Sequence, residues 1–217
     1  GSEMCIRDSR RTVLCHNIGF AMVAFCSYGT AAWIPTYFVR THGWGIGQVG
    51  LVFGLIVMIA GSAGILFGGR LSDHWRAKGI VDAPMKVGVL AAILLVPFGG
   101  GYMLAPSGWL AAALLVPATF IVSMPFGVAP AAIQDVMPNR LRGQASAIYL
   151  FFVNMIGLGI GPTAIALCTD FVFGDDQALR YSMLITSTVA CAAAIVLLRA
   201  GRAPYRETLQ RLQAQTA

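Results

Sequence analysis

The chain has 217 residues, of which 57% are hydrophobic and only 11% are charged, and its mean hydropathy is +0.73. Soluble domains carry about 25% charged residues, so a soluble fold of this size could not cover its surface with polar groups. The net charge of +6 does not indicate a nucleic-acid partner, because the cations fall between apolar stretches, where membrane topology explains them. Composition therefore predicts an integral membrane protein surrounded by a lipid bilayer.

Residues 1–9, GSEMCIRDS, match nothing that follows them. Reverse-translated, they match a common transposase sequencing adapter read in frame. We therefore expect the native sequence to begin near Arg10 and exclude these nine residues from fold reasoning. An ordinary polar N-terminus is the alternative.

Six apolar stretches are each long enough to cross the hydrocarbon core as a helix, which takes about 20 residues. The predicted spans are 13–39, 49–69, 85–105, 109–134, 145–168 and 181–198. Strands of a closed barrel alternate apolar and polar residues, and these stretches do not. The predicted fold is therefore all-α, a polytopic bundle of six transmembrane helices, with a solvated cytoplasmic tail over 201–217. A short helix at the membrane surface is the alternative for this tail.

The cations alternate between the two sides of this predicted bundle. The start of the chain, the second and fourth loops and the tail are rich in Lys and Arg, whereas the first loop has only Arg40 and the fifth sets Arg180 against three aspartates. Cytoplasmic loops retain Lys and Arg, so both termini are expected in the cytoplasm. The expected location is a bacterial inner membrane.

Six spans with both ends on one side divide into two groups of three that enter the membrane from opposite sides. This is the arithmetic of an inverted 3+3 repeat. Pairs of glycines four residues apart allow close helix approach, and they occur at Gly50 and Gly54, Gly64 and Gly68, and Gly157 and Gly161. A bend is predicted in the fifth span at Gly157, Gly159, Gly161 and Pro162, because proline removes a backbone donor.

The predicted loop after the second span, GGRLSDHWRAKG (68–79), concentrates charge in an apolar chain. Asp73 is expected to pair with Arg70 or Arg76 or to face a neighbouring helix N-terminus, which makes the cluster a candidate conformational latch. Gly69 is expected to let the helix end pack tightly. Simple charge asymmetry across the membrane is the alternative explanation.

This loop resembles the signature loop of the major facilitator superfamily. Gly69, Leu71, Asp73 and Lys78 are in register with that signature, and positions 74, 76 and 77 depart from it. The loop after the fourth span strengthens the resemblance, because its run of Asp135, Pro138, Arg140, Arg142 and Gly143 is similar to the loop between the tenth and eleventh facilitator spans. The resemblance implies the C-terminal half of a twelve-span transporter, with an N-terminal six-helix half as its partner.

Residues 13–163 further resemble spinster-like facilitators, through AAWIPTYFVRTHGW in the first span and RLRGQASAIYLFFVNMIGLGIGPT in the fifth. Spinster-like proteins are associated with export of lysophospholipids and sphingoid lipids. The resemblance also implies that the first and fourth spans line the central cavity. Trp33 and Trp44, near the predicted outer boundary, are interpreted as interface anchors.

No Asp, Glu, Lys or Arg lies at the middle of a predicted span, which argues against a coupling carboxylate in this chain. Candidates for a substrate cavity are therefore the polar and aromatic residues near mid-span, Ser27, Tyr28, Thr30, Thr119, Phe120, Ser123 and Asn154. Ordinary interhelical hydrogen bonding is the alternative for each of them. A mostly apolar cavity with a few hydroxyls favours an amphipathic small-molecule substrate over a sugar.

The predicted function is secondary active transport by alternating access, of an amphipathic or lipid-like small molecule and driven by an ion gradient. The sequence has no nucleotide-binding loop, metal-ligand spacing or enzyme site, so no catalytic residue, metal or cofactor is predicted. One alternative is a membrane module that binds or scrambles lipid without transport. Another is a native six-span protein that works as a dimer.

Overall fold

The computed structural model describes the backbone of residues 2–216 and the side chains of residues 11–211. Within this part of the chain every regular element is helical, which confirms the all-α prediction. Six helical stretches are long and apolar enough to span a membrane: Arg11–His42, Ile46–Ala77, Ala83–Met103, Gly108–Asp135, Asn139–Phe173 and Asp176–Arg211. They coincide with the six predicted spans, and all but the third extend farther at both ends than predicted.

Most spans consist of two α-helices joined by a turn of different helical geometry. Their bounds are α1 Ser2–Ala24 and α2 Thr30–His42, α3 Ile46–Ile56 and α4 Ser62–Ala77, α5 Ala83–Met103, α6 Gly108–Ser123 and α7 Ala129–Asp135, α8 Arg142–Phe152 and α9 Gly161–Leu167, and α10 Leu179–Thr216. The junctions are π-helical at Phe25–Gly29, Val57–Gly61 and Val153–Ile160, and 3-10 helical at Met124–Gly127. Such local changes interrupt the regular hydrogen-bond ladder and are common at functional sites.

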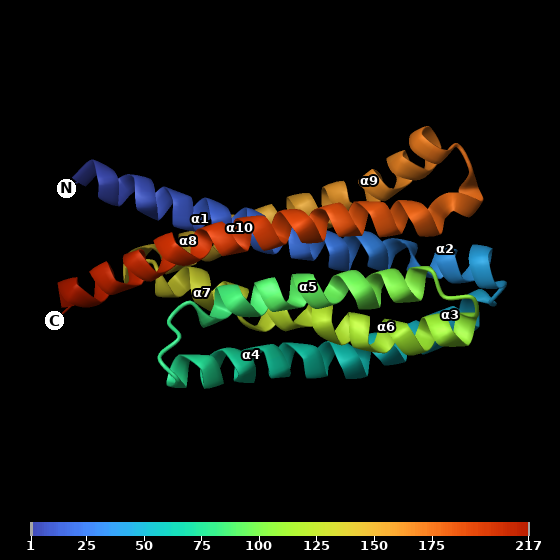
Figure 1. Ribbon diagram of the computed structural model, residues 1–217, viewed down its shortest axis with the longest axis horizontal. Coiled ribbons are helices and arrows are strands. Elements are labelled where there is room, and N and C mark those ends of the chain that lie inside the picture. Colours follow the sequence, from blue (N-terminus) through green and yellow to red (C-terminus); the bar gives the residue numbers. More distant parts are fainter. Residues whose placement is uncertain (1, 217) are drawn as a thin grey trace.

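Both chain termini lie at one end of the bundle, which we call the terminal end (Figure 1). The connections between α4 and α5 and between α7 and α8 lie at the same end, and the remaining connections lie at the other. The long helix α10 runs beside α1 and also packs on α5. The terminal end therefore receives the loops and helix ends that carry most of the Lys and Arg.

Two glycine pairs bring spans into backbone contact. A Cβ atom at Gly64 or Gly68 would meet the backbone carbonyl of Phe120 or Met124, so the second span lies directly against the fourth. A Cβ atom at Gly161 would similarly meet backbone atoms of Gly29, so the fifth span lies against the first.

These two contacts are equivalent in a 3+3 repeat. In such a repeat the first span corresponds to the fourth, and the second span corresponds to the fifth. The contact between the first and fifth spans therefore corresponds to the contact between the fourth and second spans. In both contacts, the glycines with the four-residue spacing come from the span that is second in its group of three. The third pair, Gly50 and Gly54, faces open space and makes no such contact.

Two predicted irregular segments are helical instead. The charged stretch at 68–79 was expected to be a loop, but α4 continues through it to Ala77, leaving a short connection before α5. The prediction of a solvated tail is also wrong as far as residue 211. Helix α10 continues through this segment, in which Gly201, Tyr205 and Thr208 are buried. The helices extend in this way because polar residues at the membrane surface can continue a helix beyond the apolar segment. The prediction for residues 1–9 lies outside the residues whose side chains are described.

Candidate functional site

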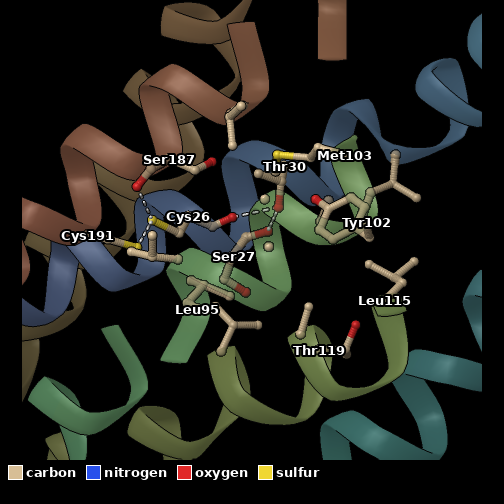
Figure 2. A pocket seen from close by; sticks show the side chains of 18 of the residues that line it. Cys26, Ser27, Thr30, Leu95, Tyr102, Met103, Leu115, Thr119, Ser187 and Cys191 are labelled. Carbon is tan, nitrogen blue, oxygen red and sulfur yellow. Dashed lines mark hydrogen bonds between the residues drawn. The ribbon is translucent and has the colours of Figure 1, made fainter. Parts of the chain in front are cut away.

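A cavity of about 210 Å³ lies between the first, third, fourth and sixth spans, with an edge formed by the second. Its labelled lining residues in Figure 2 are Cys26, Ser27, Thr30, Leu95, Tyr102, Met103, Leu115, Thr119, Ser187 and Cys191. Most of the lining is apolar, and the polar groups are hydroxyls and thiols rather than charges. Such a cavity is suited to a largely apolar ligand with a few hydrogen-bonding groups.

Some polar groups of this lining are hydrogen-bonded within the protein. The Thr30 hydroxyl donates to the carbonyl of Cys26 at 2.6 Å, and the Cys26 thiol donates to the carbonyl of Ser187 at 3.5 Å. The hydroxyl of Ser187 is fully buried and has no hydrogen-bond partner among the described residues. Leaving a buried hydroxyl unpaired costs about 1–3 kcal/mol, so a polar group of a ligand or a water in the cavity would stabilise it.

Five of the seven predicted cavity residues line this cavity. Ser27, Tyr28 and Thr30 come from the first span, and Thr119 and Ser123 come from the fourth. They lie on the helix faces that turn toward each other, so residues of both spans line this cavity. Their role in binding a substrate stays a prediction.

Phe120 and Asn154 do not line this cavity, and their role in binding a substrate also stays a prediction. Phe120 points away from Thr119 around the helix and packs on Phe67 of the second span, with ring centroids 5.4 Å apart. Asn154 is exposed, and its amide donates to the carbonyl of Leu150 one turn earlier at 2.7 Å. Helical periodicity, which turns adjacent residues about 100° apart, explains both displacements.

The sequence-based prediction missed the third and sixth spans as walls of the cavity. Leu95, Gly99, Tyr102 and Met103 of α5 face it at spacings of three and four residues, as do Leu184, Ser187, Thr188 and Cys191 of α10. This spacing marks one face of each helix. The same spacing is also typical of ordinary core packing, so it did not single these residues out.

Ion pairs join the helix ends at the terminal end of the bundle. Arg76 of α4 donates to Asp135 of α7 at 2.5 Å. Arg202 of α10 donates to Asp82 at 2.5 Å, and Arg206 lies 3.9 Å from the same carboxylate. The Asp82 side chain is only 4% exposed, so this second pair anchors the connection between α4 and α5 to the extension of α10.

The pairing expected between Asp73 and Arg70 or Arg76 is therefore wrong, whereas the alternative, in which Asp73 faces a neighbouring helix N-terminus, stays a prediction. Asp73 is exposed and forms no ion pair with a described residue, and Arg76 pairs with Asp135 instead. The other predicted cations, Arg70, Lys78, Arg140 and Arg142, are exposed. Because Asp135 belongs to the second predicted motif, the structure joins the two charged motifs through one contact between the second and fourth spans.

The small and apolar residues of these motifs have different roles from those expected. A Cβ atom at Gly69 or Gly143 would meet nothing within 4 Å, so the tight packing expected of Gly69 is absent. The neighbouring Gly68 makes that contact instead. Leu71 packs against an apolar cluster of Val87, Met124 and Val128, which links the end of α4 to the third and fourth spans.

The predicted bend in the fifth span falls in a π-helical segment. Gly157 lies against Ala24 and Tyr28, and Gly161 lies against Gly29, whereas Gly159 meets only its own helix. Pro162 follows at the start of α9, and its carbonyl accepts a hydrogen bond from the indole of Trp33 at 3.0 Å. Trp33 therefore joins the first span to the fifth, in addition to any anchoring at the interface. The bend itself stays a prediction.

Comparison with known proteins agrees with this arrangement. A model of the Major Facilitator Superfamily matches residues 9–162, more than half of the chain. The chain belongs to the Major Facilitator Superfamily. A curated relative, an MFS-type efflux pump from Mycolicibacterium smegmatis, is 27% identical over 179 residues, which cover 77% of this facilitator chain and 39% of the pump.

Two solved structures share the fold. Both are of a bacterial homolog of the human lysosomal transporter Spinster in an inward-facing conformation, and both are 18% identical to this facilitator. The match to the unoccupied form has a TM-score of 0.66 and covers 97% of this chain and 50% of the solved one. The match to the occupied form has a TM-score of 0.62 and covers 92% of this chain and 49% of the solved one. The chain therefore has the fold of one six-helix facilitator half, resembles spinster-like members, and spans about half the length of these solved structures.

Proposed function

We propose that this facilitator chain forms one half of a secondary active transporter that moves an amphipathic or lipid-like small molecule by alternating access, driven by an ion gradient. The observation that carries the proposal is the cavity between the first and fourth spans, with its apolar walls and its few hydroxyls. The unpaired hydroxyl of Ser187 supports it, because a polar group on an otherwise apolar ligand would satisfy that hydroxyl. A lysophospholipid combines an apolar chain with such groups.

The partner that we propose is an N-terminal six-helix half. The second and fifth spans are the least buried of the six, because only 28% of the apolar 18-residue stretch in each is buried inside the bundle. Large apolar side chains of both spans are exposed, including Leu51, Met58, Phe151 and Leu158. Lipid would cover part of this surface, and a second six-helix half would cover the part that faces the transport pathway. We therefore expect the 217-residue chain alone to bind ligand without transporting it.

The orientation that we propose places the terminal end in the cytoplasm of a bacterium, with the protein in the inner membrane. The described cations at the opposite end are Arg40 and Arg180, and Arg40 pairs with Asp176 at 3.4 Å. The remaining described cations lie at or near the terminal end, as charge asymmetry of cytoplasmic loops requires.

Binding to the purified chain in nanodiscs tests the site directly. We expect Thr119→Leu, which fills the cavity, to weaken binding of a fluorescent lysophospholipid at least tenfold. Thr163→Leu is the matched control, because Thr163 also lies in a span but is exposed and bonds only to its own helix at Gly159. Equal affinity of the two variants would overturn the cavity as the binding site.

Flux measurements on the transporter with both halves test the mechanism. Liposomes that contain it should accumulate the labelled lipid only when a proton or sodium gradient is imposed, if transport is coupled. Flux that equalises the two leaflets regardless of a gradient would instead identify a scrambling module. Transport by the 217-residue chain alone, with a dimeric mass in detergent, would identify a six-span protein that works as a dimer.

A further inference from the structure

Two cysteines from opposite ends of the sequence meet at the wall of the cavity. Cys26 lies in the π-helical turn of the first span and Cys191 lies in α10, and their sulfur atoms are 3.6 Å apart (Figure 2). Both cysteines are free thiols and both line the cavity. The sequence shows no spacing that would pair them, since they are separated by 165 residues.

The separation of these sulfur atoms fits two ligands of a single thiophilic atom. At a bond length of about 2.3 Å and the angle of roughly 95–100° that a trivalent pyramidal atom prefers, two sulfur ligands lie about 3.4–3.5 Å apart. The observed distance is close to this value, so both thiols could bind one atom without a shift of the first or sixth span. A disulfide would require the sulfur atoms to approach to about 2.05 Å, which is farther from the observed arrangement.

The surroundings of the pair favour a ligand that carries an apolar group. Leu95 and Val122 are among the residues that line the same cavity, and no Lys, Arg, Asp or Glu is among them. A metal ion such as Zn²⁺ takes three or four protein ligands, and the described residues contain no group of three or more His, Cys, Asp or Glu that could hold one. A neutral organic molecule with a thiophilic centre would place that centre on the sulfurs and its apolar part along the cavity.

We propose that Cys26 and Cys191 form a dithiol site for such thiophilic organic compounds, of which trivalent organoarsenicals are the class with the matching chemistry. Two As–S bonds form and two As–O bonds of the hydrated arsenical, R–As(OH)₂, break. Each thiol proton leaves with one hydroxide, so two water molecules are released and arsenic stays trivalent. The site goes beyond the proposed function, and its binding is measured without transport, so its failure would leave that proposal standing.

Arsenic retention by the full 217-residue chain tests the site. The chain has five cysteines, so the variant C5A/C15A/C168A keeps only the proposed pair. After incubation with phenylarsine oxide in nanodiscs and removal of excess reagent, we expect one arsenic per chain by elemental mass spectrometry. A monothiol should leave it bound and ethanedithiol should release it, because two bonds to one arsenic dissociate together far more rarely than a single bond.

Removal of either sulfur from this variant supplies the decisive comparison. Adding Cys26→Ala or Cys191→Ala should lower the amount of arsenic retained in the presence of monothiol at least tenfold. Cys26→Ser and Cys191→Ser should lower it by a similar factor, and circular dichroism checks that each variant remains folded. Unchanged retention after either substitution would overturn the site, as would absence of retained arsenic in the two-cysteine variant itself.

Discussion

Replacing adjacent glycines of α4 separates helix contact from helix propensity. Gly68 and Gly69 occupy the same helix and differ in their surroundings, because a Cβ atom at Gly68 would meet the backbone of Met124 whereas one at Gly69 would meet nothing within 4 Å. Ala is favoured over Gly in a helix by about 1 kcal/mol, and this gain applies to both positions. The difference between Gly68→Ala and Gly69→Ala therefore reports the contact with the fourth span.

The size of this difference follows from the rigidity of the neighbour. Overpacking a well-packed site costs about 1–3 kcal/mol, and the Met124 carbonyl belongs to a helix backbone, which cannot rotate aside as a side chain can. At about 2–4 °C per kcal/mol for a chain of this size, we expect Gly68→Ala to melt roughly 2–12 °C below Gly69→Ala. Thermal stability in one detergent, followed by fluorescence-detected size exclusion, measures it.

Two further variants make the comparison stricter. Gly64→Ala, one turn earlier against Phe120, should behave like Gly68→Ala, and Gly54→Ala, which faces open space, should behave like Gly69→Ala. If all four variants melted within one degree of each other, the close contact between the second and fourth spans would be refuted.

Two other predictions concern the terminal end. Asp82→Asn should lower the free energy of unfolding by about 3 kcal/mol, which is the low end for breaking a buried ion pair because Arg202 is partly exposed. Asp135→Asn should cost less than about 1 kcal/mol because both members of its pair are about one-third exposed. A lower melting temperature for Asp135→Asn than for Asp82→Asn would contradict this. Tyr205→Ala should cost about 3–5 kcal/mol, as for other large buried rings, because the side chain is fully buried against the bundle. Trypsin cleavage at Arg202 and Arg206, followed by mass spectrometry, should accelerate in this variant, and an unchanged cleavage rate would show that the extension of α10 is not held by Tyr205.

The spans could be predicted from the sequence because membrane insertion depends on a property that composition records directly. Six apolar stretches need six helices, and the distribution of Lys and Arg orders their ends. The helix ends were less predictable. Polar residues beyond the apolar segment can continue a helix or leave it, and the burial of Tyr205 that favours continuation depends on neighbours far away in the sequence.

Residues of the cavity could be predicted only in part. The sequence indicates how deep in the membrane a residue lies, but it does not indicate the direction in which its side chain points around the helix. Thr119 and Phe120 lie at the same depth, yet only Thr119 faces the cavity. Direction depends on the neighbouring helices, which the sequence does not place. Cys191 and Leu95 were missed for a related reason, since an apolar residue that lines a cavity is chemically the same as one that faces lipid.

The two charged motifs show how a correct location can accompany a wrong partner. Asp73 and Asp135 both lie at the end of the bundle that the charge pattern indicated, but a long Arg side chain can reach several carboxylates, so the sequence could not select the pair. Arg76 lies about two turns beyond Gly68 on α4, and Asp135 ends the span that Gly68 contacts. The ion pair is therefore the continuation of the glycine contact between the second and fourth spans. If the ion pair depends on this contact, separating these spans by Gly68→Ala will also reduce the coupling between Arg76 and Asp135 measured in a double-mutant cycle, whereas Gly69→Ala will leave that coupling unchanged.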